Sequence, residues 1–341
     1  MAHCTGYSAP TMKLGVMSAL FSGRPLEEVV RVCAENGLAA IELPVGAYPG
    51  KPFFEPSKVL ADRRSQDRIK SLLKDHGLEL SGLAVHGNPV HPDRAIAKIH
   101  HDAYVTAVKL APKLGTDIVI TFSGCPGGAK GDKTPNWVTC PWPTDFRETL
   151  KYQWDDVLVP YWASQAKLCR THGVRTAWEG HPGFCAYNPV TIIELSQRAM
   201  AASGIKGKPI LGANLDPSHF FWQGIDPILS AQMLGEAGLL FYVHAKDTEL
   251  DRHEGPRNGY LDARPYSALN SRSWNFRTCG DGHGHEFWKP FVSMLRRQGY
   301  DHVLSIEHED ALLSVDEGFR RAVRFLKEAI IEEPPAKPWW T

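Results

Sequence analysis

Four metal-competent side chains, three carboxylates and one imidazole, stand at the ends of short apolar segments in the second half of the chain. They are Glu179, Asp216, His244 and Glu307. A single carboxylate in such a place is more often a helix cap or a surface residue. Four such residues in corresponding positions indicate a metal site instead, because buried like charges are costly unless a cation compensates them. Three carboxylates and one imidazole suit a divalent cation, with Mn²⁺ the first expectation and Co²⁺, Mg²⁺ or Zn²⁺ as substitutes.

These segments belong to a series of eight short apolar runs, most of which are separated by stretches with helical periodicity. The first such stretch has apolar residues at helical spacing and ends near Gly37, a residue typical of a helix stop. We expect strands at Lys13–Ser18, Ala39–Pro44, Leu78–Val85, Asp117–Phe122, Val174–Glu179, Pro209–Asp216, Leu239–Ala245 and His302–Glu307.

Eight βα repeats predict an α/β protein of the (β/α)₈ TIM barrel type. An open doubly wound sheet would more often have five or six strands and a glycine-rich phosphate turn after the first. In a barrel, strands five to eight bring their four ligand-type residues to one point at the C-terminal face, where such barrels build their active sites. The pattern therefore predicts one metal centre at the barrel mouth.

One domain is expected at residues 12–330, with terminal extensions at 1–11 and 331–341. Two connections are too long for plain turns, residues 123–145 after strand four and residues 247–289 after strand seven. Both leave the C-terminal ends of strands. Long connections of this kind are usually lids or binding loops.

Composition argues against several partners. The formal net charge is zero, so no basic field is available for nucleic acid. No apolar run approaches the roughly 20 residues that span a bilayer, so no membrane association is expected. The seven cysteines include no CxxC pair, and the N-terminus has no secretory pattern. Reduced thiols in a cytoplasmic protein fit these features best.

The motifs around the four residues resemble those of the sugar phosphate isomerase/epimerase family, the xylose isomerase-like TIM barrels. The resemblance covers nearly the whole chain, through the segments LAVHGNPVHPD, WEGHPG, NLDPSH, VHAKD and SIEHED. It implies that Glu179, Asp216, His244 and Glu307 bind the metal. It also implies proton abstraction beside a sugar carbonyl, with Glu179 and Glu307 as candidates for proton transfer as well as ligands.

Three further histidines are candidate site residues. His219 follows Asp216 by three residues, and in relatives the matching histidine contacts substrate or a metal-bound water. His86 ends strand three and faces the same mouth, so both are assigned to substrate binding. His181 lies two residues beyond Glu179, where an imidazole can act as a base near neutral pH, so it is a catalytic candidate.

Three more residues are assigned to substrate binding in the connection after strand seven. Lys246 and Asp247 follow His244, and we expect Lys246 to point away from it while Asp247 points toward the mouth. His283 lies in the glycine-rich segment GDGHGHEFW, whose histidines could bind substrate or a second metal.

The resemblance implies isomerisation or epimerisation of a keto sugar or a 3-keto-glycoside. The long loops could enclose a glycoside. The alternative is a lyase with the same enediolate chemistry, similar to the larger subunit of bacterial C-glycoside deglycosidases. An inosose-type dehydratase, an endonuclease IV-like nuclease and a non-catalytic sugar-binding barrel are remote alternatives. A homo-oligomer, or a hetero-oligomer with a small partner subunit, is expected.

Overall fold

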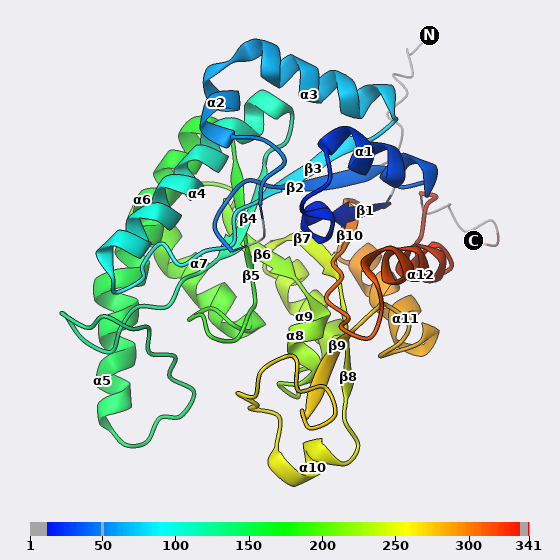
Figure 1. Cartoon of the computed structure of the whole chain (residues 1–341). Coiled ribbons are helices and arrows are strands. Elements are labelled where there is room, and N and C mark those ends of the chain that lie inside the picture. The colour runs from blue at the N-terminus through cyan, green and yellow to red at the C-terminus, as the bar shows by residue number, and fades with distance from the viewer. Residues whose placement is uncertain (1–11, 49–50, 335–339, 341) are drawn as a thin grey trace.

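A closed barrel of eight parallel strands forms the centre of the computed structural model, which describes residues 12–48, 51–334 and 340 (Figure 1). The strand order around the barrel is β1, β2, β3, β4, β5, β6, β7, β10 and back to β1. The strands are β1 Lys13–Met17, β2 Ala40–Pro44, β3 Glu79–Ala84, β4 Ile118–Phe122, β5 Arg175–Glu179, β6 Leu211–Leu215, β7 Leu240–Ala245 and β10 Val303–Ile306. The predicted TIM barrel is confirmed, and each predicted strand contains an observed one.

Most of the barrel strands are buried on both faces, as expected of a parallel sheet that is covered by helices. The covering helices pack apolar stripes against the strands. In α1 the buried residues are those that its periodicity predicts, and Gly37 has a φ of 72° just beyond the helix end. The main covering helices are α1 Leu26–Glu35, α3 Arg63–Asp75, α4 Arg94–Leu114, α6 Val159–His172, α7 Pro189–Ser203, α9 Pro227–Glu236, α11 His285–Arg297 and α12 Val315–Lys327.

Shorter elements complete the connections between strands. The single-turn helix η1 Ser18–Phe21 follows β1, and α8 Pro217–Phe221 follows β6 directly. The helix α2 Pro56–Ala61 precedes α3. After β4, an irregular segment leads into α5 Asp145–Lys151 and the π-helical η2 Tyr152–Leu158, which continue into α6.

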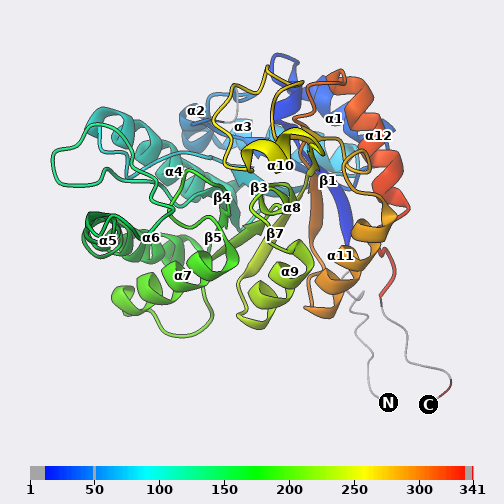
Figure 2. The same cartoon turned by 90° about the horizontal axis from the view of Figure 1, so that it is seen from below.

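The connection after β7 has regular structure of its own. It contains β8 Asp247–Leu250, α10 Glu254–Asn258 and β9 Trp274–Arg277, and the two strands form an antiparallel pair. In Figure 1 this hairpin extends below the barrel, and Figure 2, seen from below, shows α10 in front of the strands. The hairpin therefore covers the C-terminal face. Helix α11 begins at His285, four residues earlier than the expected end of this connection.

Among the described residues, no helix is long and apolar enough to cross a membrane. The domain limits of 12–330 remain a prediction. Residues 1–11, 335–339 and 341, which belong to the predicted extensions, lie outside the described part of the chain.

Candidate metal centre

The four predicted ligands meet at the C-terminal end of the barrel. Glu179 is the last residue of β5, Asp216 follows β6, His244 lies within β7, and Glu307 follows β10. One ligand atom from each residue lies within 4.8 Å of one atom from every other. We call these residues the metal quartet. Their convergence follows from the closed barrel, because consecutive parallel strands end side by side.

The chemistry of the quartet fits a divalent cation. Glu179, Asp216 and His244 are almost completely buried, and the side chain of Glu307 is 15% exposed. Two buried carboxylate oxygens, Asp216 Oδ2 and Glu307 Oε2, have no hydrogen-bond partner. Buried polar atoms normally have hydrogen-bond partners, whereas these two oxygens have only ion-pair contacts, which leaves them able to bind a cation. Carboxylate oxygens and one imidazole nitrogen form a donor set suited to Mn²⁺, Mg²⁺, Co²⁺ or Zn²⁺.

Lys246 lies against the quartet, and the orientation expected for it from the sequence was wrong. Its Nζ is 2.8 Å from Glu307 Oε2 and 3.1 Å from Asp216 Oδ2, so it forms an ion pair with both oxygens. Side chains at i and i+2 of an extended chain share a face, so Lys246 rather than Asp247 points the same way as His244. Burial alone would lower the pKa of Lys246, but the carboxylates, led by Asp216, raise it well above its usual range.

The carboxylates of the quartet respond differently to this environment. Burial raises the pKa of Asp216 to about 7, although Lys246 opposes the shift. Burial also acts to raise the pKa of Glu307, but Lys246 reverses the effect and holds it well below its usual range. Glu179, Asp216 and Glu307 thus place three carboxylates beside Lys246 and His244, and a divalent cation would add positive charge at the same place.

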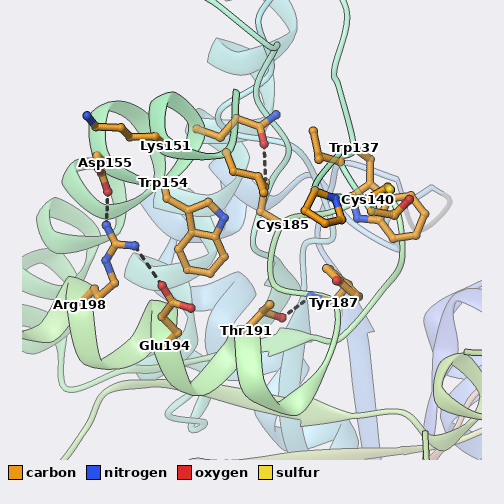
Figure 3. A pocket seen from close by; sticks show the side chains of 15 residues that line it. Trp137, Cys140, Lys151, Trp154, Asp155, Cys185, Tyr187, Thr191, Glu194 and Arg198 are labelled. Atoms are coloured by element: carbon orange, nitrogen blue, oxygen red, sulfur yellow. Dashed lines mark hydrogen bonds and ion pairs between the residues drawn. The ribbon is translucent and has the colours of Figure 1, made fainter. Parts of the chain in front are cut away.

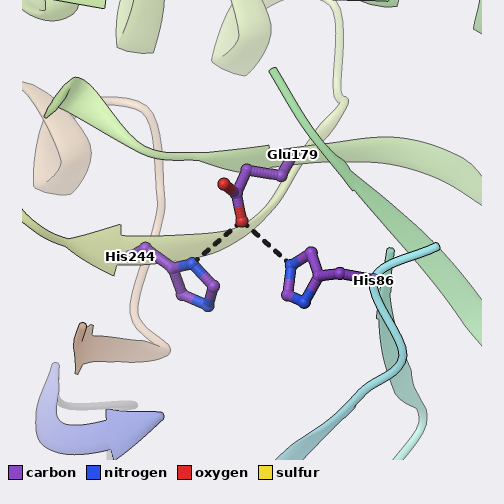
Figure 4. A group of neighbouring side chains, drawn as sticks. All are labelled: His86, Glu179 and His244. Atoms are coloured by element: carbon purple, nitrogen blue, oxygen red, sulfur yellow. Dashed lines mark hydrogen bonds and ion pairs between the residues drawn. The ribbon is translucent and has the colours of Figure 1, made fainter. Parts of the chain in front are cut away.

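Two predicted histidines, His86 and His219, contact Glu179. His86 Nε2 is 2.9 Å from Glu179 Oε2 (Figure 4). His219 Nε2 is 3.0 Å from Oε1. Asn214 Nδ2 donates a third hydrogen bond to Oε2, at 3.2 Å. Burial would raise the pKa of Glu179, but His86, His219 and His244 lower it well below its usual value. Glu179 is therefore held as an oriented carboxylate.

Glu42, on β2, is a site residue that the sequence analysis missed. It is fully buried, and His244 Nε2 lies 3.0 Å from its Oε2, to which Ser305 Oγ also donates at 2.8 Å. Burial would lower the pKa of His244, but Glu42 and Glu307 raise it well above its usual value. A carboxylate that accepts from one ring nitrogen of a histidine leaves the other nitrogen oriented for a metal. The available signal was a lone glutamate inside the apolar strand AIELP.

His181 lies beside the quartet and faces a cavity of about 500 Å³ at the barrel mouth. Its ring centroid is 4.0 Å from that of His219, and its Nδ1 is 2.5 Å from the carbonyl oxygen of Pro182. Burial lowers its pKa. A neutral imidazole that donates through Nδ1 has an unprotonated Nε2. The cavity is lined by Tyr48, Phe122, His181, Phe184, Tyr266, Leu269, Asn275, Phe276, Glu309 and Ala311.

The structure brings Asp247 and His283 together in a separate network. Asp247 Oδ1 is 2.8 Å from His283 Nδ1, and its Oδ2 accepts from the backbone N–H groups of Gly280 and His283 and from Trp288 Nε1. The His283 ring stacks on Phe221 with centroids 3.8 Å apart. Asp247 thus holds the start of α11 and the glycine-rich segment. A substrate-binding role for the pair stays a prediction.

A second cavity, of about 430 Å³, lies between the connection after β4 and α7 (Figure 3). Trp137, Trp154 and Tyr187 are among its walls, and Arg198 forms ion pairs with Asp155 and Glu194 at one side. The connection between β5 and α7 separates it from the mouth, since Phe184 lines the mouth cavity while the neighbouring Cys185 lines this one. None of the predicted site residues lines it.

The geometry agrees with comparisons to known proteins. The sequence profile of the xylose isomerase-like TIM barrel family matches residues 30–329. This chain belongs to the xylose isomerase-like TIM barrel family. One relative is the uncharacterized protein YfiH of Bacillus subtilis (strain 168). It is 33% identical over 322 residues, which cover 94% of this chain and 99% of YfiH.

Solved structures share the fold of this xylose isomerase-like barrel. The probable 3-DHS dehydratase AsbF of Bacillus anthracis superposes with a TM-score of 0.63 at 18% identity, covering 93% of this chain and 99% of AsbF. A D-tagatose 3-epimerase-like protein gives 0.61 at 18% identity, with 93% and 98% coverage. An IolI protein with a zinc atom gives 0.62 at 17% identity, also with 93% and 98% coverage.

Proposed function

We propose that this chain is a divalent-metal-dependent enzyme that removes a proton next to the carbonyl of a keto sugar or a 3-keto-glycoside. Return of the proton would give isomerisation or epimerisation. One observation carries the proposal: four ligand-type side chains from four neighbouring strands converge, with one ligand atom from each within 4.8 Å of the others. The epimerase-like and zinc-containing structures on the same barrel support it.

Glu179, Asp216, His244 and Glu307 would hold the cation. When bound, a divalent cation polarises the sugar carbonyl and stabilises the negative charge that develops on its oxygen, which acidifies the adjacent C–H. Mn²⁺ is our first assignment. Lys246 adds a positive charge beside Glu307, where it can favour an anionic carbonyl oxygen by the same electrostatic argument.

Three residues are proposed to move the proton. His181 faces the mouth cavity with Nε2 as an acceptor, because its Nδ1 is bonded to the Pro182 carbonyl. Glu307 is the most exposed member of the quartet, so it can approach a substrate. Glu179 remains a candidate, although His86, Asn214 and His219 already bond to its oxygens. His86, His219 and Lys246 would orient the sugar around the metal.

A lyase reaction is the second candidate, and the apolar lining of the mouth cavity favours it, because a leaving group must have room there. The carbanion formed beside the carbonyl would then expel a group on the next carbon instead of regaining a proton. The fold shared with the probable dehydratase AsbF is compatible with this outcome. A deglycosidase of this type could require a small partner subunit.

Incubation with Mn²⁺ in D₂O tests both reactions on a free ketose and on a 3-keto-glucoside. Deuterium incorporation without aglycone release, measured by mass spectrometry, supports an isomerase or epimerase. Aglycone release supports the lyase. The absence of both, in protein shown to contain stoichiometric metal, would contradict the proposal.

A further inference from the structure

The mouth cavity differs in character from the metal quartet that it adjoins. Seven of its ten lining residues are aromatic or aliphatic, and the other three are His181, Asn275 and Glu309. Its volume of about 500 Å³ falls within the roughly 300–1,000 Å³ typical of small-molecule sites. A polyhydroxylated sugar ring placed there would leave hydroxyl groups without partners, which is costly when they are buried.

Direct contacts join the cavity to the quartet. Lys246 Nζ is 3.1 Å from Glu309 and 4.7 Å from the ring centroid of Phe276, both of which line the cavity, and it also contacts Glu307. On another side, His181 lies against His219, which bonds Glu179. A molecule whose reacting carbon is at the quartet therefore extends into the apolar space when it carries a further substituent.

The aromatic walls of the mouth cavity suit a planar substituent. Phe122 and Phe184 stack with ring centroids 4.1 Å apart and planes at 18°, and Tyr266 and Phe276 lie 5.7 Å apart at 26°. The interaction between aromatic rings is most favourable when they stack or meet edge to face at such separations. Tyr266 is 56% exposed and Tyr48 is 55% exposed, so apolar surface continues to the rim. Single exposed apolar residues are ordinary, but a contiguous apolar patch around a mouth indicates a ligand.

We infer that Tyr48, Phe122, Phe184, Tyr266, Leu269 and Phe276 form a subsite for a planar apolar group, so that the substrate is an aryl glycoside whose oxidised sugar faces the quartet. This inference rests on the proposed function for the placement of the sugar. The hairpin after β7 supplies Tyr266, Leu269 and Phe276, and thereby selects the glycoside by its aglycone.

Binding of two matched probes tests the subsite. Phenyl and methyl 3-keto-β-glucoside differ only in the group that would enter the cavity. Calorimetry on the Mn²⁺-loaded protein should give a Kd for the phenyl compound at least about tenfold lower than for the methyl compound, because burial of an aromatic ring commonly exceeds that effect. Ratios within about twofold would overturn the inference.

Two variants of one residue locate the effect. Tyr266→Ala should bring the ratio of the two Kd values toward one, whereas Tyr266→Phe, which keeps the ring, should retain it. Leu261→Ala is the matched control, because Leu261 is 70% exposed on the same hairpin and does not line the cavity. Equal ratios in Tyr266→Ala and Leu261→Ala would overturn the inference, provided that thermal melting shows both variants to be folded.

Deuterium exchange measured on the same samples separates this inference from the proposed function. A phenyl preference in binding without exchange on either probe supports the subsite and contradicts the proposed chemistry. Exchange on both probes with no phenyl preference supports the chemistry and overturns the subsite.

Discussion

Glu42 on β2 accepts a hydrogen bond from the imidazole of His244 on β7, across the interior of the barrel. Because this bond occupies Nε2, Nδ1 is the nitrogen that faces the quartet, 3.2 Å from Glu179 and 3.3 Å from Glu307. The carboxylate thus orients the imidazole of His244, a proposed metal ligand. Residues in this position commonly affect metal affinity strongly although they do not touch the metal.

Glu42→Gln should weaken binding of Mn²⁺ by about 10- to 100-fold, because glutamine is a weaker acceptor for His244 and no longer favours the correct tautomer. Competition with a fluorescent chelator measures the affinity. Glu79→Gln is the control, since Glu79 lies at the start of β3 and pairs with Lys13 at the surface. Equal Mn²⁺ affinity in wild type and Glu42→Gln would show that Glu42 has only a packing role in the barrel interior.

Removal of the metal should lower thermal stability. A cation present at 100 times its Kd stabilises the folded state by about 2.7 kcal/mol, provided that it does not bind the unfolded chain. A chelator should therefore lower the Tm, and added Mn²⁺ should restore it. Asp216→Ala should show no such dependence on Mn²⁺. A Tm unaffected by chelator and by Mn²⁺ in the wild type would count against the metal centre.

Lys246→Met should destabilise the metal-free protein strongly. Loss of one partner from a buried ion pair typically costs about 3–5 kcal/mol, and here it leaves Asp216 and Glu307 without their cation. Mn²⁺ should recover much of this loss. Urea unfolding with chelator and with Mn²⁺ measures both effects, and Lys98→Met, at an exposed pair with Asp102, is the control. A variant as stable as wild type in chelator would refute this role.

Asp310→Asn should remove a pH-dependent contribution to stability. Asp310 accepts hydrogen bonds from the Thr278 and Leu312 backbone and from Arg277. Burial would raise its pKa, but these donors lower it below the usual value. The contribution is therefore present above the unfolded pKa of about 4 and is lost as pH falls through the folded pKa.

The measurement for Asp310 is the free energy of unfolding from denaturant titrations at several pH values. At neutral pH the variant should be less stable by about 1–3 kcal/mol. The difference from wild type should shrink as the solution is made more acidic. A difference that is constant across acidic and neutral pH would show that the charge of Asp310 contributes nothing.

The barrel and the quartet were predictable because apolar runs recur and each ligand ends one. The place of Glu42 in the site was not predictable, since only the closed sheet brings β2 and β7 to face each other across the barrel interior. Lys246 shows a different limit: alternation could have placed it correctly, but whether it contacts Asp216 depends on the bend of the chain after β7. The mouth cavity draws on residues as distant as Tyr48 and Ala311, so no local pattern could assemble it.

The hairpin after β7 has a small apolar cluster of its own, in which Trp274 and Phe276 pack against Trp222 from the connection after β6. The four residues of the quartet, by contrast, lie on or directly after barrel strands. Under the proposed function, the reaction type would be set by the barrel, and substrate choice would be set in part by the hairpin. Exchange of the hairpin between homologous barrels is a route by which evolution, or a designer, can redirect the same chemistry to a new molecule.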